Sequence, residues 1–265
     1  MTNSENLKCQ VDDRGIAYLT MAKPEIHNAF DDRLIADMAT IFDALSKDAD
    51  VRIIILGAEG KSFSAGADLN WMRRMATYSD AENIADAEKL AQLLKLISSS
   101  PKPVIARVQG ATFGGGVGLV AACDIAIGTD SSLFSLSEVR LGLIPSVISP
   151  YVIRAISGRQ ASRYMLTGER FGAEEAFRVG LLHQVAGDDA IDNAIEAIVG
   201  ELLKNGPEAM SECKGLISYV AGKPVNGDLM TETARRIARV RASDEGREGL
   251  NAFLEKRQPA WLEDK

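Results

Sequence analysis

The sequence predicts an α/β fold, because stretches typical of buried strands alternate with stretches typical of helices over most of the chain. In the clearest unit, a β-branched apolar stretch at residues 104–108 precedes three glycines, Gly114 to Gly116, and then an apolar stretch of small residues. The last part of the chain is mainly helical. We therefore expect a core over residues 1–200 and a helical region over 201–265.

The first elements are predicted from alternation and capping. Residues 7–10 and 16–21 flank a polar turn that contains Gly15, which is typical of a β-hairpin. Asp31 or Asp32 can cap a helix whose apolar residues recur at helical spacing. Those residues are Leu34, Ile35, Met38, Ile41, Phe42 and Leu45.

The same periodicities place the remaining elements. Further strands are expected at residues 51–56, 104–108 and 124–127. Further helices are expected from about Asp68 and at residues 80–97, 117–122, 173–179, 191–203, 207–220, 228–241 and 245–256.

Composition argues against several classes of function. The net charge of −7 gives no basic surface for nucleic acid, and no apolar stretch is long enough to span a membrane. Cys9, Cys123 and Cys213 are far apart and odd in number, so they match neither a disulfide framework nor a zinc site. No secretory signal is visible, and we expect a cytoplasmic protein.

The glycine turn suits a bound anion. A strand, a glycine turn and a helix start together aim free N–H groups at one point. Phosphate fingerprints fail. Leu119 stands where a third dinucleotide-binding glycine belongs, and Gly116-Val117 follows Gly115 where a P-loop would need Lys and Ser/Thr. Two interpretations stay open: a site for a developing oxyanion, or a tight turn packed closely on a helix.

A second segment and one carboxylate could complete such a site. Residues 63–72 follow a strand, are rich in small residues and lead into a helix capped near Asp68. Only two histidines occur, His27 and His183, so acid–base chemistry should fall to carboxylates, and a multi-histidine metal site is not expected. Glu138 is the lone acid within an uncharged segment, residues 131–139; its alternative interpretation is a surface carboxylate.

The order of these motifs resembles the crotonase (enoyl-CoA hydratase/isomerase) superfamily over nearly the whole chain. The matching segments are residues 63–69, 110–124, 134–145, 166–168, 173–181 and 253–257. The resemblance implies a spiral of βαβ units with a helical C-terminal trimerisation region. It also implies homotrimers, or hexamers that are dimers of trimers.

The resemblance further implies an acyl-CoA substrate, with CoA as part of the substrate and no separate cofactor. The N–H groups of Ala67 and Gly115 would hold the thioester oxygen, and Glu138 would be the acid–base group. The residues that would contact substrate or CoA are Ala65, Ala67, Asp68, Leu69, Gly115, Phe253 and Lys256. The last two could come from a neighbouring subunit.

One departure from the family pattern affects the reaction. Relatives that hydrate commonly carry two glutamates, whereas Gly118 stands at the first position here and only Glu138 remains. Residues 67–72 and 143–151 most resemble the branch of bacterial methylglutaconyl-CoA and isohexenylglutaconyl-CoA hydratases. Three functions therefore stay open: hydration of a branched 2-enoyl-CoA with a distal carboxylate, Δ3–Δ2 enoyl-CoA isomerisation through Glu138 alone, and a non-catalytic, RNA-binding role.

A distal carboxylate would need a cationic partner in the acyl pocket, because an unpaired buried charge is costly. The candidates are Arg73, Arg74, Arg140 and Arg154.

Overall fold

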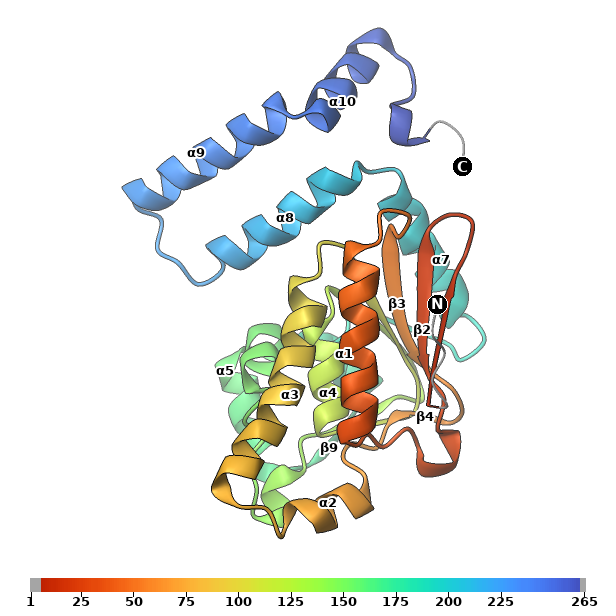
Figure 1. Cartoon of the computed structure of the whole chain (residues 1–265), viewed down its shortest axis with the longest axis vertical. Coiled ribbons are helices and arrows are strands. Elements are labelled where there is room, and N and C mark those ends of the chain that lie inside the picture. The colour runs from red at the N-terminus through yellow and green to blue at the C-terminus, as the bar shows by residue number, and fades with distance from the viewer. Residues whose placement is uncertain (1–5, 263–265) are drawn as a thin grey trace.

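The computed structural model describes residues 6–262 of the chain. A six-stranded sheet forms its centre (Figure 1). In sheet order the strands are β1 (Leu7–Val11), β2 (Ile16–Met21), β3 (Ile53–Ala58), β5 (Val104–Val108), β7 (Ile125–Thr129) and β10 (Gln184–Ala186). The hairpin pair β1–β2 is antiparallel and the other pairs are parallel. The predicted α/β class and the hairpin are confirmed.

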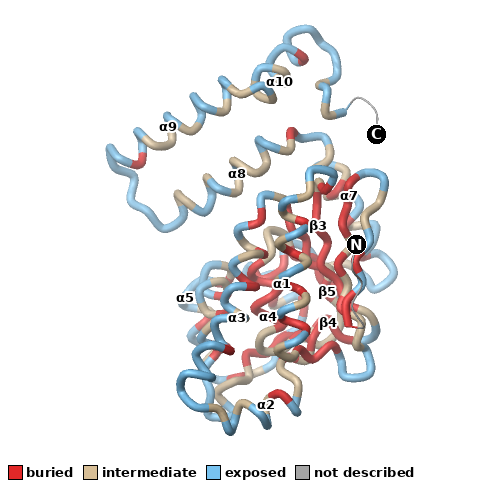
Figure 2. Tube along the Cα trace, viewed as in Figure 1, coloured by how far each residue is buried: buried red, intermediate tan, exposed pale blue. Residues whose placement is uncertain are grey.

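Helices cover both faces of this sheet, because its strands are apolar on both sides. On one face lie α1 (Asp32–Lys47), α3 (Asp80–Ser99) and α4 (Gly115–Ala122), as Figure 1 shows. The isoleucines of the other face pack against α7 (Ile191–Leu203). Burial is concentrated along the strands and on the inner sides of the helices (Figure 2). The cap of α1 is Asp31, whose side chain accepts a hydrogen bond from the Leu34 N–H.

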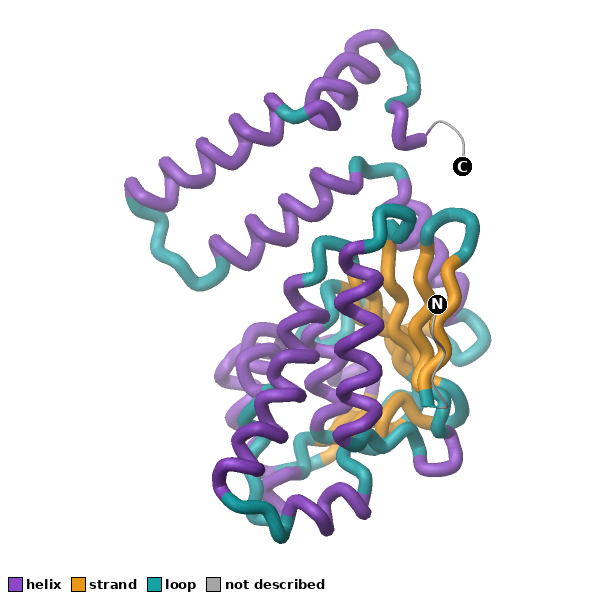
Figure 3. Tube along the Cα trace, in the orientation of Figure 1, coloured by secondary structure: helices purple, strands orange, loops and turns teal. Residues whose placement is uncertain are grey.

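A second, four-stranded sheet was not predicted. Its strands, in sheet order, are β4 (Ser62–Ser64), β6 (Ala111–Phe113), β8 (Leu133–Ser135) and β9 (Arg170–Gly172) (Figure 3). Each strand has only three residues, which is too short for alternation to be recognised. This sheet matters for function, because β4 leads toward Ala67 and β6 leads into the glycine turn.

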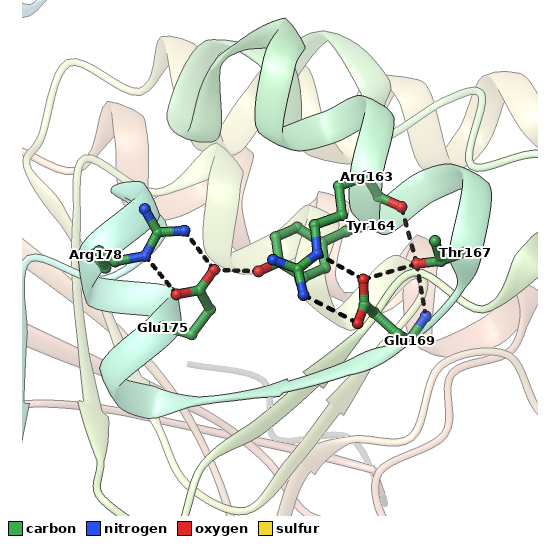
Figure 4. A network of polar contacts seen from close by, with 6 residues as sticks. All are labelled: Arg163, Tyr164, Thr167, Glu169, Glu175 and Arg178. Atoms are coloured by element: carbon green, nitrogen blue, oxygen red, sulfur yellow. Dashed lines mark hydrogen bonds and ion pairs between the residues drawn. The ribbon is translucent and has the colours of Figure 1, made fainter.

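Helix α5 (Ser149–Thr167) and helix α6 (Ala173–Val179) flank β9 and are joined by a polar network (Figure 4). The buried Tyr164 donates its hydroxyl hydrogen to Glu175, which also binds Arg178. Arg178, followed by the Tyr164 hydroxyl, lowers the pKa of Glu175 to about 2. Arg163 binds Glu169 with both guanidinium branches. The network fixes the segment that pairs with β8.

The C-terminal helices α8 (Pro207–Val220), α9 (Gly227–Ala242) and α10 (Asp244–Glu255) project away from the sheets (Figure 1). The predicted helical C-terminal region of the crotonase-like fold is confirmed. Lys256 follows α10 in a left-handed conformation, with φ of 56°, rather than continuing the helix. The division at residue 200 falls inside α7 and stays a prediction.

Short elements complete the described chain. They are η1 (Pro24–Ile26), α2 (Leu69–Met75), η2 (Glu138–Leu141) and η3 (Ala260–Leu262). Between residues 6 and 262, no helix has both the length and the apolar character that crossing a membrane requires.

Candidate active site

Ala67 presents a backbone N–H that has no hydrogen-bond partner among the described residues, whereas the N–H groups of its neighbours are bonded. The Ala65 N–H donates to the His27 carbonyl at 2.9 Å, and the Asp68 N–H donates to the Phe30 carbonyl at 3.0 Å. The Gly66 N–H donates to the Ser64 hydroxyl at 3.2 Å. Within the described chain no acceptor is found for the Ala67 N–H, and Ala67 is partly exposed. Its N–H is therefore available to a ligand.

The glycine turn presents a second donor. Gly114 has φ of 51° and ψ of −119°, a conformation that residues with a Cβ rarely adopt. Its N–H donates to the Ser135 carbonyl at 2.9 Å. Gly115 and Gly116 open α4, and their N–H groups have no acceptor among residues 6–262, as expected at a helix start. Gly116 is buried and Gly115 is partly exposed, so the Gly115 N–H is the accessible one.

Phe30 connects the two donor segments. Its backbone forms a parallel bridge with Ala67, and a Cβ at Gly115 would stand only 2.1 Å from its ring carbon Cζ. Gly66, with φ of 91°, packs on the Phe113 carbonyl, which would lie 3.1 Å from a Cβ there. The Ala67 segment and the glycine turn therefore touch each other and share one aromatic neighbour.

Glu138 reaches this turn from η2. Its Oε1 would lie 3.1 Å from a Cβ at Gly114, so the carboxyl group faces the turn. Its Oε2 is buried and has no hydrogen-bond partner among the described residues. Burial raises the pKa of Glu138, opposed by a weaker hydrogen bond from its own backbone. A carboxyl group with a raised pKa can both donate and accept a proton near neutral pH.

Ile148 occupies the space beside Gly118. A Cβ at Gly118 would lie 2.2 Å from Cγ2 of Ile148 and 2.7 Å from its Cβ. Ile148 is buried and immediately precedes α5. No second carboxylate can therefore enter from position 118 unless Ile148 moves.

The sequence of the whole domain matches a known family. Residues 12–264 match the family model described as enoyl-CoA hydratase/isomerase. The chain belongs to the enoyl-CoA hydratase/isomerase family. An enoyl-CoA hydratase from Shewanella pealeana has the same fold, with a TM-score of 0.94 and 45% identity, covering 97% of this chain and 96% of that one. The predicted crotonase superfamily membership, and with it the enoyl-CoA hydratase class of enzyme, is confirmed.

Two curated relatives in this enoyl-CoA hydratase/isomerase family are named for different reactions. A trans-2-decenoyl-[acyl-carrier-protein] isomerase from Streptococcus mutans is 29% identical over 256 residues, covering 94% of this chain and 95% of the relative. An (E)-benzylidenesuccinyl-CoA hydratase from Thauera aromatica is 29% identical over 251 residues, covering 93% of this chain and 95% of the relative.

The remaining predicted site residues of this hydratase/isomerase are only partly brought together. Ala65 and Leu69 flank Ala67, and the Asp68 carboxylate caps α2 by accepting from the N–H groups of the next helical turn. Phe253 and Lys256 are exposed at the end of α10, which lies at the opposite end of the molecule from α2 (Figure 1). Within one chain they do not reach Glu138.

The two histidines of this family member lie outside the reacting groups. His183 lies just before β10, and its Nδ1 accepts a hydrogen bond from the Ala126 N–H at 3.1 Å. The Nδ1 of His27 is 3.0 Å from the Ser62 hydroxyl. Both rings therefore have structural partners.

The four candidate arginines differ in their partners. Arg74 binds Asp32 at 2.5 Å, and Arg73 binds Asn70 at 2.7 Å. The guanidinium carbon of Arg154 lies 5.6 Å from the centre of the Tyr151 ring. Arg140 makes no ion pair within residues 6–262. None of the four has a described contact with Glu138, so a cation for a distal carboxylate stays a prediction.

Sequence reasoning missed two residues of the site, Phe30 and Ile148. Each lies far along the chain from the glycine that it touches, and no local pattern marks such a contact.

A cavity of about 810 Å³ between α7 and strands β2, β3 and β5 contains none of the predicted site residues. The chemistry therefore does not coincide with the most voluminous cavity described.

Proposed function

We propose that the protein hydrates a 2-enoyl-CoA thioester. In this proposal Ala67 and Gly115 bind the thioester oxygen, and Glu138 is the acid–base group. One observation carries it: a part-buried carboxyl group faces a turn whose accessible N–H has no acceptor in the described part of the chain. Backbone donors aimed at a developing oxyanion are worth about 3–4 kcal/mol each in such sites.

The reaction balances with one carboxylate. Glu138 removes a proton from water while the water oxygen bonds to C3 of the enoyl group. The electrons of the double bond move to the thioester oxygen, giving an enolate that the two N–H groups stabilise. Glu138 then returns the proton to C2, and the carboxylate is restored. Its raised pKa makes the Glu138 carboxylate a stronger base for the first step, the removal of the proton from water.

For the acyl group, we propose a branched chain with a distal carboxylate, similar to 3-methylglutaconyl-CoA. The resemblance of residues 67–72 and 143–151 to that branch supports this choice. So does the Thauera relative, whose substrate is by its name a thioester of a dicarboxylic acid. Exposed apolar side chains next to Ala67 and Glu138 suit an acyl chain. They are Leu69, Leu141, Leu143 and Ile144.

Δ3–Δ2 isomerisation is the second candidate, and Ile148 favours it. An isomerase needs one base that moves a single proton, and Ile148 leaves no room at Gly118 for a second acid. The Streptococcus relative carries out an isomerisation. Hydration remains the first proposal, because one carboxylate can serve both proton transfers.

We propose an assembly of trimers or dimers of trimers, in which α10 of one copy reaches the site of another. This would bring Phe253 and Lys256 to CoA. The apolar side chains of α10 support it, since Leu250, Phe253 and Leu254 are 53%, 81% and 75% exposed in the single chain.

A panel assay tests the reaction. The purified protein is incubated with crotonyl-CoA, 3-methylglutaconyl-CoA, isohexenylglutaconyl-CoA and a 3-enoyl-CoA, while hydration and double-bond migration are followed separately. The proposal expects hydration, fastest for a substrate with a distal carboxylate. Migration without hydration would replace it by the isomerase.

A further inference from the structure

A small hollow lies on the face of the β6–β8–β9 sheet that points away from the apolar core. Phe113, Ser135 and Arg170 stand side by side across the three strands, because they are register partners. The neighbouring row, Thr112, Phe134 and Phe171, is buried in the interior. The hollow has a volume of about 240 Å³. Its lining residues are Phe113, Ser135, Ser137, Arg140, Leu141 and Arg170.

Two positive charges line this hollow and no carboxylate does. Neither Arg140 nor Arg170 has an ion-pair partner in the described part of the chain. The acid next to Arg170 in the sequence, Glu169, is bound by Arg163 (Figure 4). Glu138, two residues before Arg140 in the sequence, has its carboxyl group against Gly114 instead. The two guanidinium groups are therefore not neutralised by any side chain between residues 6 and 262.

Each arginine side chain contacts a neighbouring residue. The guanidinium carbon of Arg170 lies 5.2 Å from the centre of the Phe113 ring, which is a cation–π contact. The side chain of Arg140 lies over Gly168, where a Cβ would be 3.2 Å from Nε. The Ser135 hydroxyl donates to the Gly168 carbonyl, whereas the Ser137 hydroxyl has no hydrogen bond within residues 6–262.

We infer that this hollow binds a small anion, a carboxylate or phosphate group, between Arg140 and Arg170 with Ser137 as an added donor. Guanidinium groups bind both anions through paired N–H donors, and fixed guanidinium groups lose little freedom when they do so. The volume of about 240 Å³ is large enough for one such group.

The position of the hollow links it to the catalytic turn. Ser135 accepts the Gly114 N–H, and Ser137 directly precedes Glu138. The anion could be a carboxylate carried by the acyl substrate or free phosphate. Only the first source rests on the proposed function, so the site itself can be tested without turnover.

The first test titrates the full-length protein with inorganic phosphate at low ionic strength by isothermal titration calorimetry. Arg140→Gln and Arg170→Gln should each weaken saturable binding about tenfold or more, as expected for loss of a charged hydrogen-bonding partner. Arg159→Gln, an exposed arginine of α5 outside the hollow, is the matched control and should bind as the wild type does.

The second test compares KM for two enoyl-CoA substrates that differ only in a distal carboxylate. If the substrate supplies the anion, Arg140→Gln should raise KM about tenfold or more for the carboxylated substrate alone. Phosphate binding without this effect assigns the site to free phosphate. If neither test separates Arg140→Gln and Arg170→Gln from Arg159→Gln, the inference is overturned.

Discussion

The side chain of Ile148 fills the space that a side chain at position 118 would occupy. A Cβ placed on Gly118 would lie only 2.2 Å from Cγ2 of Ile148. The contact joins the second turn of α4 to the start of α5. It explains in physical terms why position 118 carries glycine, and it leaves Glu138 as the acid that faces the turn. The packing of α4 against Ile148 therefore limits which acidic groups can take part in the reaction.

Gly118→Ala should destabilise the protein by about 1–3 kcal/mol, because the added methyl group overpacks a buried contact. The measurement is the free energy of unfolding from urea denaturation. Gly200→Ala is the control: it lies inside α7 with no atom within 4 Å of a Cβ, and should stabilise by about 0.5–1 kcal/mol. Adding Ile148→Ala should recover part of the loss at Gly118. Equal effects of the two alanines would contradict the clash.

The Tm of Glu138→Gln should rise relative to the Tm of the wild type as the pH increases. A free glutamate titrates near pH 4.3, and burial raises the pKa of Glu138 in the folded state. Between these two pKa values the folded state holds more protons than the unfolded state, so wild-type stability falls with rising pH. The difference in Tm, variant minus wild type, should therefore be larger near pH 8 than near pH 4.

The control for the loss of one carboxylate is Glu174→Gln, at an exposed position of α6. A Tm difference for Glu138→Gln that stays constant across this pH range would show that Glu138 is not desolvated in solution.

Lys214→Ala should destabilise the attachment of α8 by about 1–3 kcal/mol, the cost of removing a charged donor from two partly buried acceptors. The Lys214 ammonium lies 2.6 Å from Asp124 and 2.8 Å from the Lys102 carbonyl. Urea denaturation and limited proteolysis of the C-terminal helices measure the loss. Lys204→Ala breaks an exposed pair with Glu201 and should cost at most about 1 kcal/mol. Similar losses in both variants would mean that Lys214 does not anchor α8.

Mixing two inactive variants tests whether the site is shared between subunits. Lys256→Ala should lose CoA affinity and Glu138→Gln should lose turnover, so each homo-oligomer should be impaired for a different reason. After joint refolding, some sites should combine an intact Glu138 with an intact Lys256 of the partner copy. Recovered activity, measured per milligram, supports the proposed assembly. Activity equal to the average of the separate variants would exclude it.

The strands and helices with a clear local sequence pattern were predicted from the sequence. β5 and α4 were predicted because a β-branched apolar stretch and small helical residues surround the glycines. The last helices were predicted to within about a residue at each end by their apolar spacing. The strands of the small sheet have three residues each, and their pairing comes from tertiary contacts that a sequence pattern does not carry.

The residues of the candidate site also differ in whether a local sequence pattern predicts them. Glu138 was predicted from its uncharged surroundings, and it is part-buried in the structure. Phe30 and Ile148 were not predicted, because their contacts with Gly115 and Gly118 depend on how distant segments pack. Phe253 and Lys256 depend on a second copy of the chain, so their roles stay predictions.

The turnover number of Glu138→Gln tests the central claim most directly. The variant keeps the shape of the side chain but cannot accept or return a proton, so kcat on the best enoyl-CoA of the panel should fall by about 100-fold or more. CoA binding should be unchanged and the variant should still be folded at the assay temperature, so the loss can be assigned to the proton transfer. A variant with near-wild-type kcat would contradict the assignment of Glu138 as the acid–base group.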